Sequence, residues 1–351
     1  MSAASPPSRR TRGARLKLVA LIGAIALGLG LVTSTSAMPS FESLLGRVRG
    51  AFHKSAGAAQ NARVASEPAP LAKPTATEPV AKVKKGRNTV SWGVMMVPEA
   101  FEPGPDGSYD LIIHFNGNVD LTLEGLDRLD INAVYVVINL GIGSSVYEQT
   151  FAGPSSIQTL LDRVPAELKK RGLPNPRLGR LALTAWSAGY GAIMQIIAQP
   201  KFAEQVDSIV LLDGLHTSLK KNSLEADPLM LQNITAFAKA AVRGERLLTI
   251  THSNVEPIGY ASVKASTDLI LGDLALERSP ASGATIIPDM ASVKGVLPRD
   301  EMVALVPVST VDAGAFHVRG YKGNEPTHHI SHLLQASEIA FPTLAARWKK
   351  R

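Results

Sequence analysis

The sequence predicts an α/β protein built on a doubly wound, mostly parallel sheet with helices on both faces. The composition is that of a globular protein, with 45% hydrophobic and 19% charged residues. Several short apolar runs are typical of strands that are covered on both faces. Helical stretches alternate with these runs, and strands that alternate with helices form right-handed crossover units of a parallel sheet.

The expected strands begin at Thr89, where the Ala-, Pro- and Lys-rich sequence gives way to short apolar runs. Each is a short apolar run bounded by polar or glycine-containing segments. The strands are expected at 89–97, 111–115, 133–140, 181–185, 208–212, 247–251 and 303–308. The helices are expected at 156–171, 188–198, 229–243, 260–276 and 329–350. Two stretches, 222–243 and 279–298, are expected to form a cap or the walls of a pocket.

Two segments precede this domain, which is expected to span residues 89–351. Residues 1–37 combine a basic start, an uncharged run over 18–32 and a small-residue stretch, as in a signal peptide for export to the periplasm or the extracellular space. The run has 15 residues, which is shorter than the ~20 apolar residues of a membrane span. Cleavage is expected after Ala37, and an uncleaved segment would anchor the chain to the membrane.

Residues 38–88 are rich in Ala, Pro and Lys, and we expect a semi-extended tether that forms no core. Apolar residues recur at helical spacing between Phe41 and Phe52, with basic residues beside them. A helix of this kind would contact an anionic membrane surface or the cell envelope. The simpler interpretation is a transient helix in a solvated tether, because so short a helix is marginal in water.

Charge and cysteine content exclude several classes of protein. The net charge of +7 comes from the first 88 residues, because residues 89–351 contain 23 basic and 27 acidic side chains. An acidic folded domain argues against a nucleic-acid partner. The chain has no cysteine, which excludes disulfides, thiolate metal sites and a cysteine nucleophile.

The most informative segment is the strand at 181–185 and the residues that follow it. The strand leads into Ser187 and then into a helix that lacks a polar cap. A serine held in a tight, strained turn between a strand and a helix requires small residues two positions before and after it. Here these residues are Ala185 and Gly189. The segment resembles the nucleophile elbow, G-x-S-x-G, of the α/β-hydrolase superfamily, with alanine in place of the first glycine. The alternative is an ordinary strand-to-helix turn with a capping serine.

A second segment, His114 to Asn118, resembles the end of the third strand and the oxyanion loop of this superfamily. The resemblance implies that Asn116 and Gly117 form the turn. A backbone amide of residues 115–118 would then pair with the amide of Ala188 to bind an oxyanion. By itself, Asn-Gly is a common turn signal.

The resemblance also implies the chain order serine, acid, histidine, with the acid after the sixth or seventh strand. Asp213 ends the expected strand at 208–212 and is the preferred acid. Its Asp-Gly sequence is also typical of a simple turn. Glu256 follows the next strand and is the reserve candidate.

The base is expected among three histidines near the end of the chain. His329, expected in the loop that opens the last helix, is the preferred base, and His332 is the reserve. His328 and His332 are four residues apart, as metal ligands on a helix are, but a histidine stands where a zinc protease has its glutamate. We therefore assign no metal and no other cofactor. His216, three residues after Asp213, is expected to line the same pocket.

Together these segments imply an exported serine hydrolase, an esterase or lipase-like enzyme that forms an acyl-enzyme on Ser187. Its substrate would be a small-molecule or lipid-like ester. One alternative is a non-catalytic binding protein of the cell envelope with the same fold, in which Ser187 and His329 would lie too far apart to form a hydrogen bond. The other is a metal-dependent hydrolase that uses His328, His329 and His332.

Overall fold

The structure is a computed structural model that describes residues 82–287 and 303–349, all within one compact unit. Its strands are β1 (Gly86–Val90), β2 (Gly93–Val97), β3 (Ser108–Phe115), β4 (Val134–Ile138), β5 (Arg177–Trp186), β6 (Val206–Leu212), β7 (Leu247–His252), β8 (Ser279–Pro280), β9 (Pro307–Ala313) and β10 (Phe316–Tyr321). Its helices are α2 (Val119–Asp127), α3 (Ser144–Phe151), α4 (Pro154–Lys170), η3 (Ser187–Gly189), α5 (Tyr190–Ile197), α6 (Pro200–Ala203), η4 (Pro228–Leu231), α7 (Gln232–Val242), α8 (Val263–Asp273), α9 (Pro326–Leu334), α10 (Ala336–Ile339) and α11 (Phe341–Trp348).

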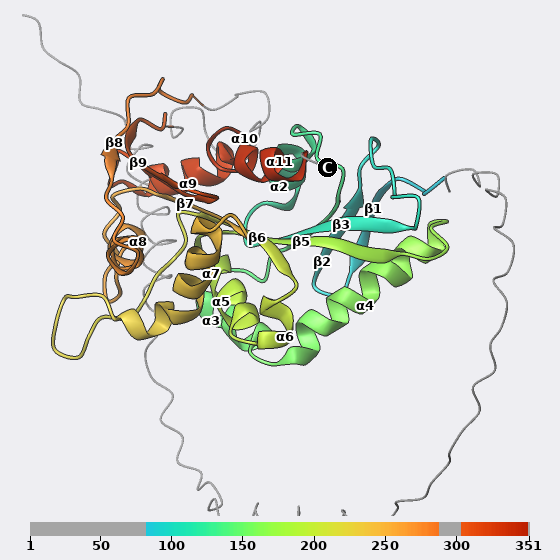
Figure 1. Cartoon of the computed structure of the whole chain (residues 1–351), viewed down its shortest axis with the longest axis horizontal. Coiled ribbons are helices and arrows are strands. Elements are labelled where there is room, and N and C mark those ends of the chain that lie inside the picture. Colours follow the sequence, from blue (N-terminus) through green and yellow to red (C-terminus); the bar gives the residue numbers. More distant parts are fainter. Residues whose placement is uncertain (1–81, 288–302, 350–351) are drawn as a thin grey trace, which may run out of the picture. The chain divides into compact units, whose positions relative to one another are not determined.

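The strands form one sheet in the order β1-β2-β4-β3-β5-β6-β7-β10-β9-β8 (Figure 1). The central run β4-β3-β5-β6-β7-β10 is parallel throughout. β2 pairs antiparallel with both β1 and β4. β9 pairs antiparallel with β10 and β8. The predicted α/β fold class is confirmed, because the sheet is mostly parallel and helices cover both of its faces.

Two apolar layers, one on each face of the sheet, form the core (Figure 1). Because side chains alternate along a strand, Ile113 of β3 packs in the layer covered by α3, α4, α5, α7 and α8. Its neighbour Ile112 packs in the layer covered by α2, α10 and α11. With both faces covered, the carboxyl ends of the parallel strands are left for a site, as in other open α/β sheets.

The expected strand over 89–97 is in fact two strands. Ser91 adopts a left-handed conformation (φ 42°) between β1 and β2 and turns the chain into a hairpin. β1 begins at Gly86, inside the range expected to be tether. It begins there because Val83 is buried in the core and Arg171 donates hydrogen bonds to the carbonyls of residues 84–86.

The C-terminal third differs most from the expectation. The strand expected over 303–308 is replaced by a bridge at Leu305 and by β9, which pairs with the unpredicted strand β10 across a turn at Gly314 (φ 60°). The helix expected over 329–350 begins at Pro326 and divides into α9, α10 and α11. Pro342, in the first turn of α11, cannot donate a backbone hydrogen bond and so prevents one continuous helix.

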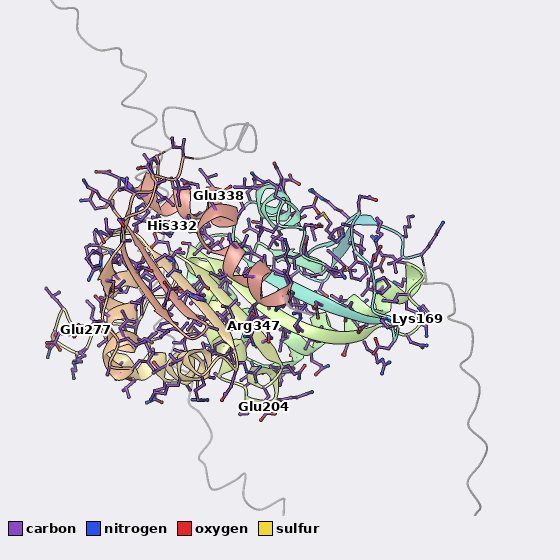
Figure 2. The ribbon with its side chains drawn as sticks, turned by 45° about the horizontal axis from the view of Figure 1, so that its top comes forward. Lys169, Glu204, Glu277, His332, Glu338 and Arg347 are labelled. Carbon is purple, nitrogen blue, oxygen red and sulfur yellow. The ribbon has the colours of Figure 1, made fainter. Side chains whose placement is uncertain are left out.

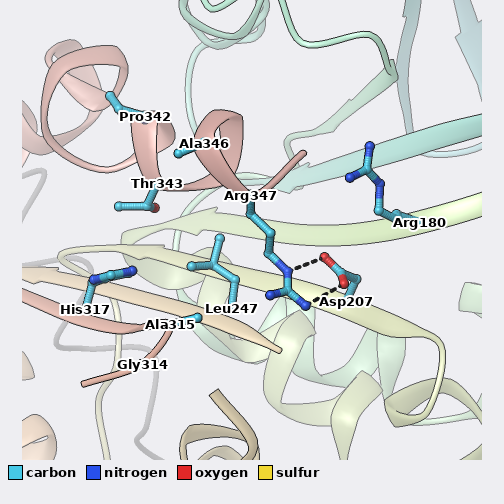
Figure 3. A pocket seen from close by; sticks show the side chains of 10 residues that line it. All are labelled: Arg180, Asp207, Leu247, Gly314, Ala315, His317, Pro342, Thr343, Ala346 and Arg347. Carbon is cyan, nitrogen blue, oxygen red and sulfur yellow. Dashed lines mark hydrogen bonds and ion pairs between the residues drawn. The ribbon is translucent and has the colours of Figure 1, made fainter. Parts of the chain in front are cut away.

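α11 is tied to the amino ends of β5 and β6. The Arg347 guanidinium forms a two-point ion pair with Asp207, with both N–O distances 2.9 Å (Figure 3). The Trp348 indole N–H also donates to Asp207, at 2.9 Å. The Arg180 guanidinium lies 4.8 Å from the centroid of the Trp348 ring. These contacts hold α11 against the sheet.

Several expectations lie outside the described residues. They are the signal peptide (1–37), the tether up to residue 81 with its amphipathic stretch, and residues 288–298 of the second expected pocket wall. Within the described ranges, no helix is long and apolar enough to span a bilayer.

Candidate active site

Ser187 lies in a strained turn directly after β5. Its φ of 50° places it in the left-handed region, which is costly for a non-glycine residue and persists only where the surroundings impose it. η3 has no side-chain cap and leads directly into α5. A Cβ atom at Gly189 would lie 2.1 Å from the Phe115 carbonyl oxygen, so this position requires glycine. The predicted strand–turn–helix is confirmed.

Ser187, His329 and Asp213 form a continuous chain of hydrogen bonds. The distance from Ser187 Oγ to His329 Nε2 is 2.8 Å, and that from His329 Nδ1 to Asp213 Oδ2 is also 2.8 Å. A buried carboxylate accepts, so Nδ1 carries the hydrogen and Nε2 presents its lone pair to the serine hydroxyl. This is the arrangement in which an imidazole can take a proton from a serine.

Asp213 is buried and accepts hydrogen bonds from Ser253 as well as from His329. It has a φ of 43° at the end of β6. Ser253 donates its backbone amide to Oδ1 (2.9 Å) and its hydroxyl to Oδ2 (2.7 Å). Burial by itself would raise the pKa of Asp213, but the neighbouring imidazoles of His332 and His329 and the hydrogen bonds from His329 and Ser253 outweigh it and hold that pKa well below its usual value. The carboxylate therefore stays ionised at neutral pH.

Neither reserve candidate contacts Ser187. The Glu256 side chain is exposed, and within the described ranges it has no interaction with the site. His332 lies on α9 (Figure 2), where its Nδ1 contacts the Thr251 hydroxyl at 2.7 Å. Burial lowers the pKa of His332 to about 4, so this imidazole is neutral at pH 7.

The sequence predicted a loop position for His329, but this residue is the fourth of α9. The helix begins early because Pro326 suits its first turn and because Glu325 and His328 form a reciprocal capping box. His328 Nδ1 thus accepts the Glu325 amide. In the part of the chain that the structure describes, no group of three His, Cys, Asp or Glu side chains could hold a metal ion.

The loop after β3 turns at Asn116 (φ 67°) and Gly117 (φ 127°), as the sequence predicts. The Asn116 amide donates to the Ile138 carbonyl (2.8 Å), and the Asn116 carbonyl accepts from His114 Nε2 (2.7 Å). Asn139 Nδ2 donates to the Gly117 carbonyl (2.7 Å). These bonds fix the loop. Among the described residues, no acceptor binds the Gly117 amide, so this N–H is available to a ligand.

The side chain of Asn116 ties this loop to the elbow. Its Nδ2 donates to the Trp186 carbonyl (3.1 Å), next to the nucleophile. Its Oδ1 accepts from the Tyr147 hydroxyl (3.1 Å), and burial raises the pKa of Tyr147 to about 12, which keeps this donor protonated. Asn116 therefore positions the loop and is not itself an oxyanion donor. The Ala188 amide, in the first turn of η3, lacks an intrahelical acceptor.

We predict that Asn116→Asp lowers both the melting temperature and kcat. The substitution keeps the shape of the side chain and its acceptor for Tyr147, but it places a carboxylate oxygen against the Trp186 carbonyl. An unsatisfied buried acceptor costs about 1–3 kcal/mol. Thermal unfolding and ester turnover measure the two effects. Tyr147→Phe removes the other bond of Asn116 and also the acceptor of the Leu140 amide (3.0 Å), but it leaves the contact with the Trp186 carbonyl intact. It should therefore lower kcat less than Asn116→Asp does, and an equal loss of kcat would contradict this account.

Trp186 contacts His329 through both its indole N–H and its ring. Its indole N–H donates to the His329 carbonyl at 3.0 Å. The two rings lie 5.0 Å apart between centroids, at an angle of 30°. An aromatic face at this distance also stabilises a positive charge, and His329 acquires one if it takes the serine proton.

Four of these supporting residues escaped the sequence analysis: Trp186, Ser253, Asn139 and Tyr147. Ser253 and Asn139 carried a signal, because each is a polar residue directly after a buried strand. The carboxyl ends of parallel strands meet at one edge of a sheet. Tyr147 carried no such signal, since it lies on the unpredicted helix α3.

A cavity of about 690 Å³ lies away from this site (Figure 3). Its lining includes Arg180, Asp207 and Leu247, near the amino ends of β5, β6 and β7, whereas Ser187 and Asp213 follow the carboxyl ends. At about 3.3 Å per residue, strands of this length separate the two by roughly 20 Å. The charged groups of the cavity are already paired within the protein, so we assign it no role in the chemistry.

No family model matches this chain, and no curated protein matches it. Similar solved structures include three hydrolases. Enterochelin esterase from Shigella flexneri is 12% identical, with 79% of this chain and 60% of that chain covered and a TM-score of 0.39. Aspergillus fumigatus lipase B is 15% identical (46% and 41% covered, TM-score 0.28). Pyrococcus horikoshii acylaminoacyl peptidase is 12% identical (57% and 36% covered, TM-score 0.32).

This chain spans about three fifths of the enterochelin esterase structure.

Proposed function

We propose that this protein is a serine hydrolase that cleaves carboxylic esters through an acyl-enzyme on Ser187. One observation carries the proposal. A serine strained into the left-handed region contacts an imidazole at 2.8 Å, and that imidazole contacts a buried carboxylate at 2.8 Å. A structural turn or a capping serine needs neither the strain nor the imidazole.

In the proposed reaction, Ser187 Oγ attacks the ester carbonyl while His329 Nε2 takes the hydroxyl proton. His329 then gives this proton to the leaving alcohol, and the carbon–oxygen bond of the ester breaks. A water molecule, activated by the same imidazole, hydrolyses the acyl-enzyme and restores Ser187. Asp213 keeps its proton-free state and holds His329 in the reactive tautomer.

The developing oxyanion needs fixed donors. We assign this role to the backbone amides of Ala188 and Gly117, as the resemblance implies. The hydrogen bonds that fix the other groups of the loop at Asn116 and Gly117 support this assignment.

The alternative of a non-catalytic binding protein expects Ser187 and His329 to lie beyond hydrogen-bond distance, and the 2.8 Å contact does not favour it. The metal-dependent alternative needs His328 and His332 together, but these side chains contact Glu325 and Thr251. The proposal therefore includes no cofactor. Its substrate class is a small-molecule or lipid-like ester.

We further propose that the protein acts outside the cytoplasm. The basic, apolar and small-residue parts of residues 1–37 support export, and residues 38–88 would then link the domain to the membrane surface or the cell envelope. Fractionation of cells that express the full chain tests this, and recovery in the cytoplasm alone would contradict it.

Labelling with a fluorophosphonate probe tests the proposed chemistry. The probe phosphonylates a serine only where an adjacent base activates it. We expect one adduct on the native protein, and peptide mass spectrometry should place it on Ser187. A folded protein that takes up no label, or that carries the label on another serine, would overturn the proposal.

We predict that Asp213→Asn lowers ester turnover by about 10³- to 10⁴-fold at neutral pH, because an uncharged amide favours the wrong tautomer of His329. Slow labelling of Ser187 by a strong electrophile should persist. Glu256→Gln is the matched control and should leave turnover unchanged, since Glu256 lies exposed. The opposite ranking would move the acid to Glu256.

A further inference from the structure

His216 lies beside the proposed site but has no part in the mechanism above. It is three residues beyond Asp213, in the segment that follows β6. The start of this segment touches the nucleophile: a Cβ atom at Gly214 would lie 2.4 Å from the Ser187 carbonyl oxygen and 2.7 Å from its nitrogen. His216 is also close enough to feel the charges of Asp213 and His329.

One nitrogen of His216 is committed and the other is not. Nδ1 lies 2.9 Å from the Ala261 carbonyl oxygen. A carbonyl can only accept, so Nδ1 carries the hydrogen and Nε2 has a lone pair. Burial lowers the pKa of His216 to about 4, so the ring is neutral at pH 7. Within the described ranges Nε2 has no protein partner, and it is not enclosed by the protein.

Two tyrosines flank this ring. Tyr190, on the helix that begins after the elbow, lies 5.5 Å from His216 between ring centroids, at 69°. Tyr260 lies 4.8 Å away, at 83°. Burial raises the pKa of both phenols, so both tyrosine side chains are uncharged at neutral pH. The two tyrosine rings therefore pack edge to face on His216, whose Nε2 has no protein partner in the part of the chain that the structure describes.

We propose that His216 is a specificity-determining residue whose Nε2 accepts a hydrogen bond from a hydroxyl or amide N–H of the ester substrate, while Tyr190 and Tyr260 cover the adjoining apolar atoms. The substrate class is thereby narrowed to esters that carry such a donor near the scissile carbonyl. This inference rests on the proposed function.

A purely structural role for His216 would use only Nδ1. That bond, together with the Ala261 amide bound to the Thr217 carbonyl (2.9 Å), joins the segments after β6 and β7. It gives no reason for a neutral, accessible lone pair at Nε2. The two roles therefore depend on different atoms of one ring and can be separated by substitution.

The experiment uses two variants of the full chain. His216→Asn keeps a donor at the position of Nδ1 and removes the acceptor at Nε2. His216→Gln places a carboxamide oxygen near the position of Nε2 and removes the donor to Ala261. Each is assayed with two substrate pairs, the 4-nitrophenyl esters of 3-hydroxybutanoate and butanoate, and glycerol monobutanoate with propyl butanoate. The readout is the ratio of kcat/KM within each pair.

We expect the native protein to prefer the hydroxyl-bearing ester in at least one pair by about tenfold, which is the worth of one buried hydrogen bond. His216→Asn should abolish this preference, and His216→Gln should retain most of it. Two results would overturn the proposal: no preference in the native protein, or a preference that survives in His216→Asn.

Labelling of the native protein by the fluorophosphonate probe is measured in parallel. Without labelling, the proposed function fails whatever the ratios are. With labelling and unchanged ratios, only the role of His216 fails.

Discussion

Ser187→Ala is expected to abolish fluorophosphonate labelling and to lower ester kcat by about 10⁴- to 10⁶-fold. The variant keeps a methyl group in the strained position at φ 50° but has no nucleophile. The remaining rate would come from substrate binding and the backbone amides alone, which elsewhere exceed the reaction in water by about 10³- to 10⁴-fold. Turnover of a 4-nitrophenyl ester measures the loss.

Ser279→Ala, at an exposed serine on β8, is the matched control and should leave labelling and turnover unchanged. The melting temperature of both variants shows whether they are folded. Full activity in a folded Ser187→Ala protein would end the serine mechanism.

His329→Ala is expected to lower kcat nearly as much, because Ser187 then has no base. Groups that act as a unit are not additive, so the Ser187→Ala/His329→Ala double variant should lose little more than either single variant. The double variant and both single variants are assayed with the same ester, which makes the comparison independent of substrate choice.

His332→Ala separates the two candidate bases. His332 is buried against Thr251 and does not contact Ser187. Its loss should therefore lower the melting temperature, but it should lower kcat far less than His329→Ala does. The opposite ranking of the two histidine variants would move the base to His332.

The central strands could be predicted because burial on both faces leaves continuous apolar runs. β3 and β6 are examples, with almost every residue buried. β9 and β10 lie toward one edge of the sheet, where β9 has a single buried residue and β10 mixes buried with half-buried residues. Such short, mixed segments do not differ from loops by composition. The turn at Ser91 was also hidden, because a left-handed serine has no distinctive neighbours in the sequence.

The proposed triad could be predicted because chain order and strand order agree. β5 and β6 are adjacent and parallel, so the residues that follow them, Ser187 and Asp213, meet at one edge. The depth of His329 within α9 could not be predicted, since it depends on where Pro326 and Glu325 begin the helix. The support from Ser253 depends on the register between β6 and β7, which the sequence alone does not reveal.

The anchoring of α11 by Arg347 and Trp348 has a consequence for how reactivity depends on folding. Ser187 and Asp213 directly follow strands of the sheet, whereas His329 lies on α9, the first helix of the C-terminal helical layer that ends with α11. Parts of a protein open locally well before the whole unfolds. If this layer detaches, the imidazole leaves with it and the serine is an ordinary alcohol. On the proposed mechanism, a partly opened chain would therefore have no activated nucleophile.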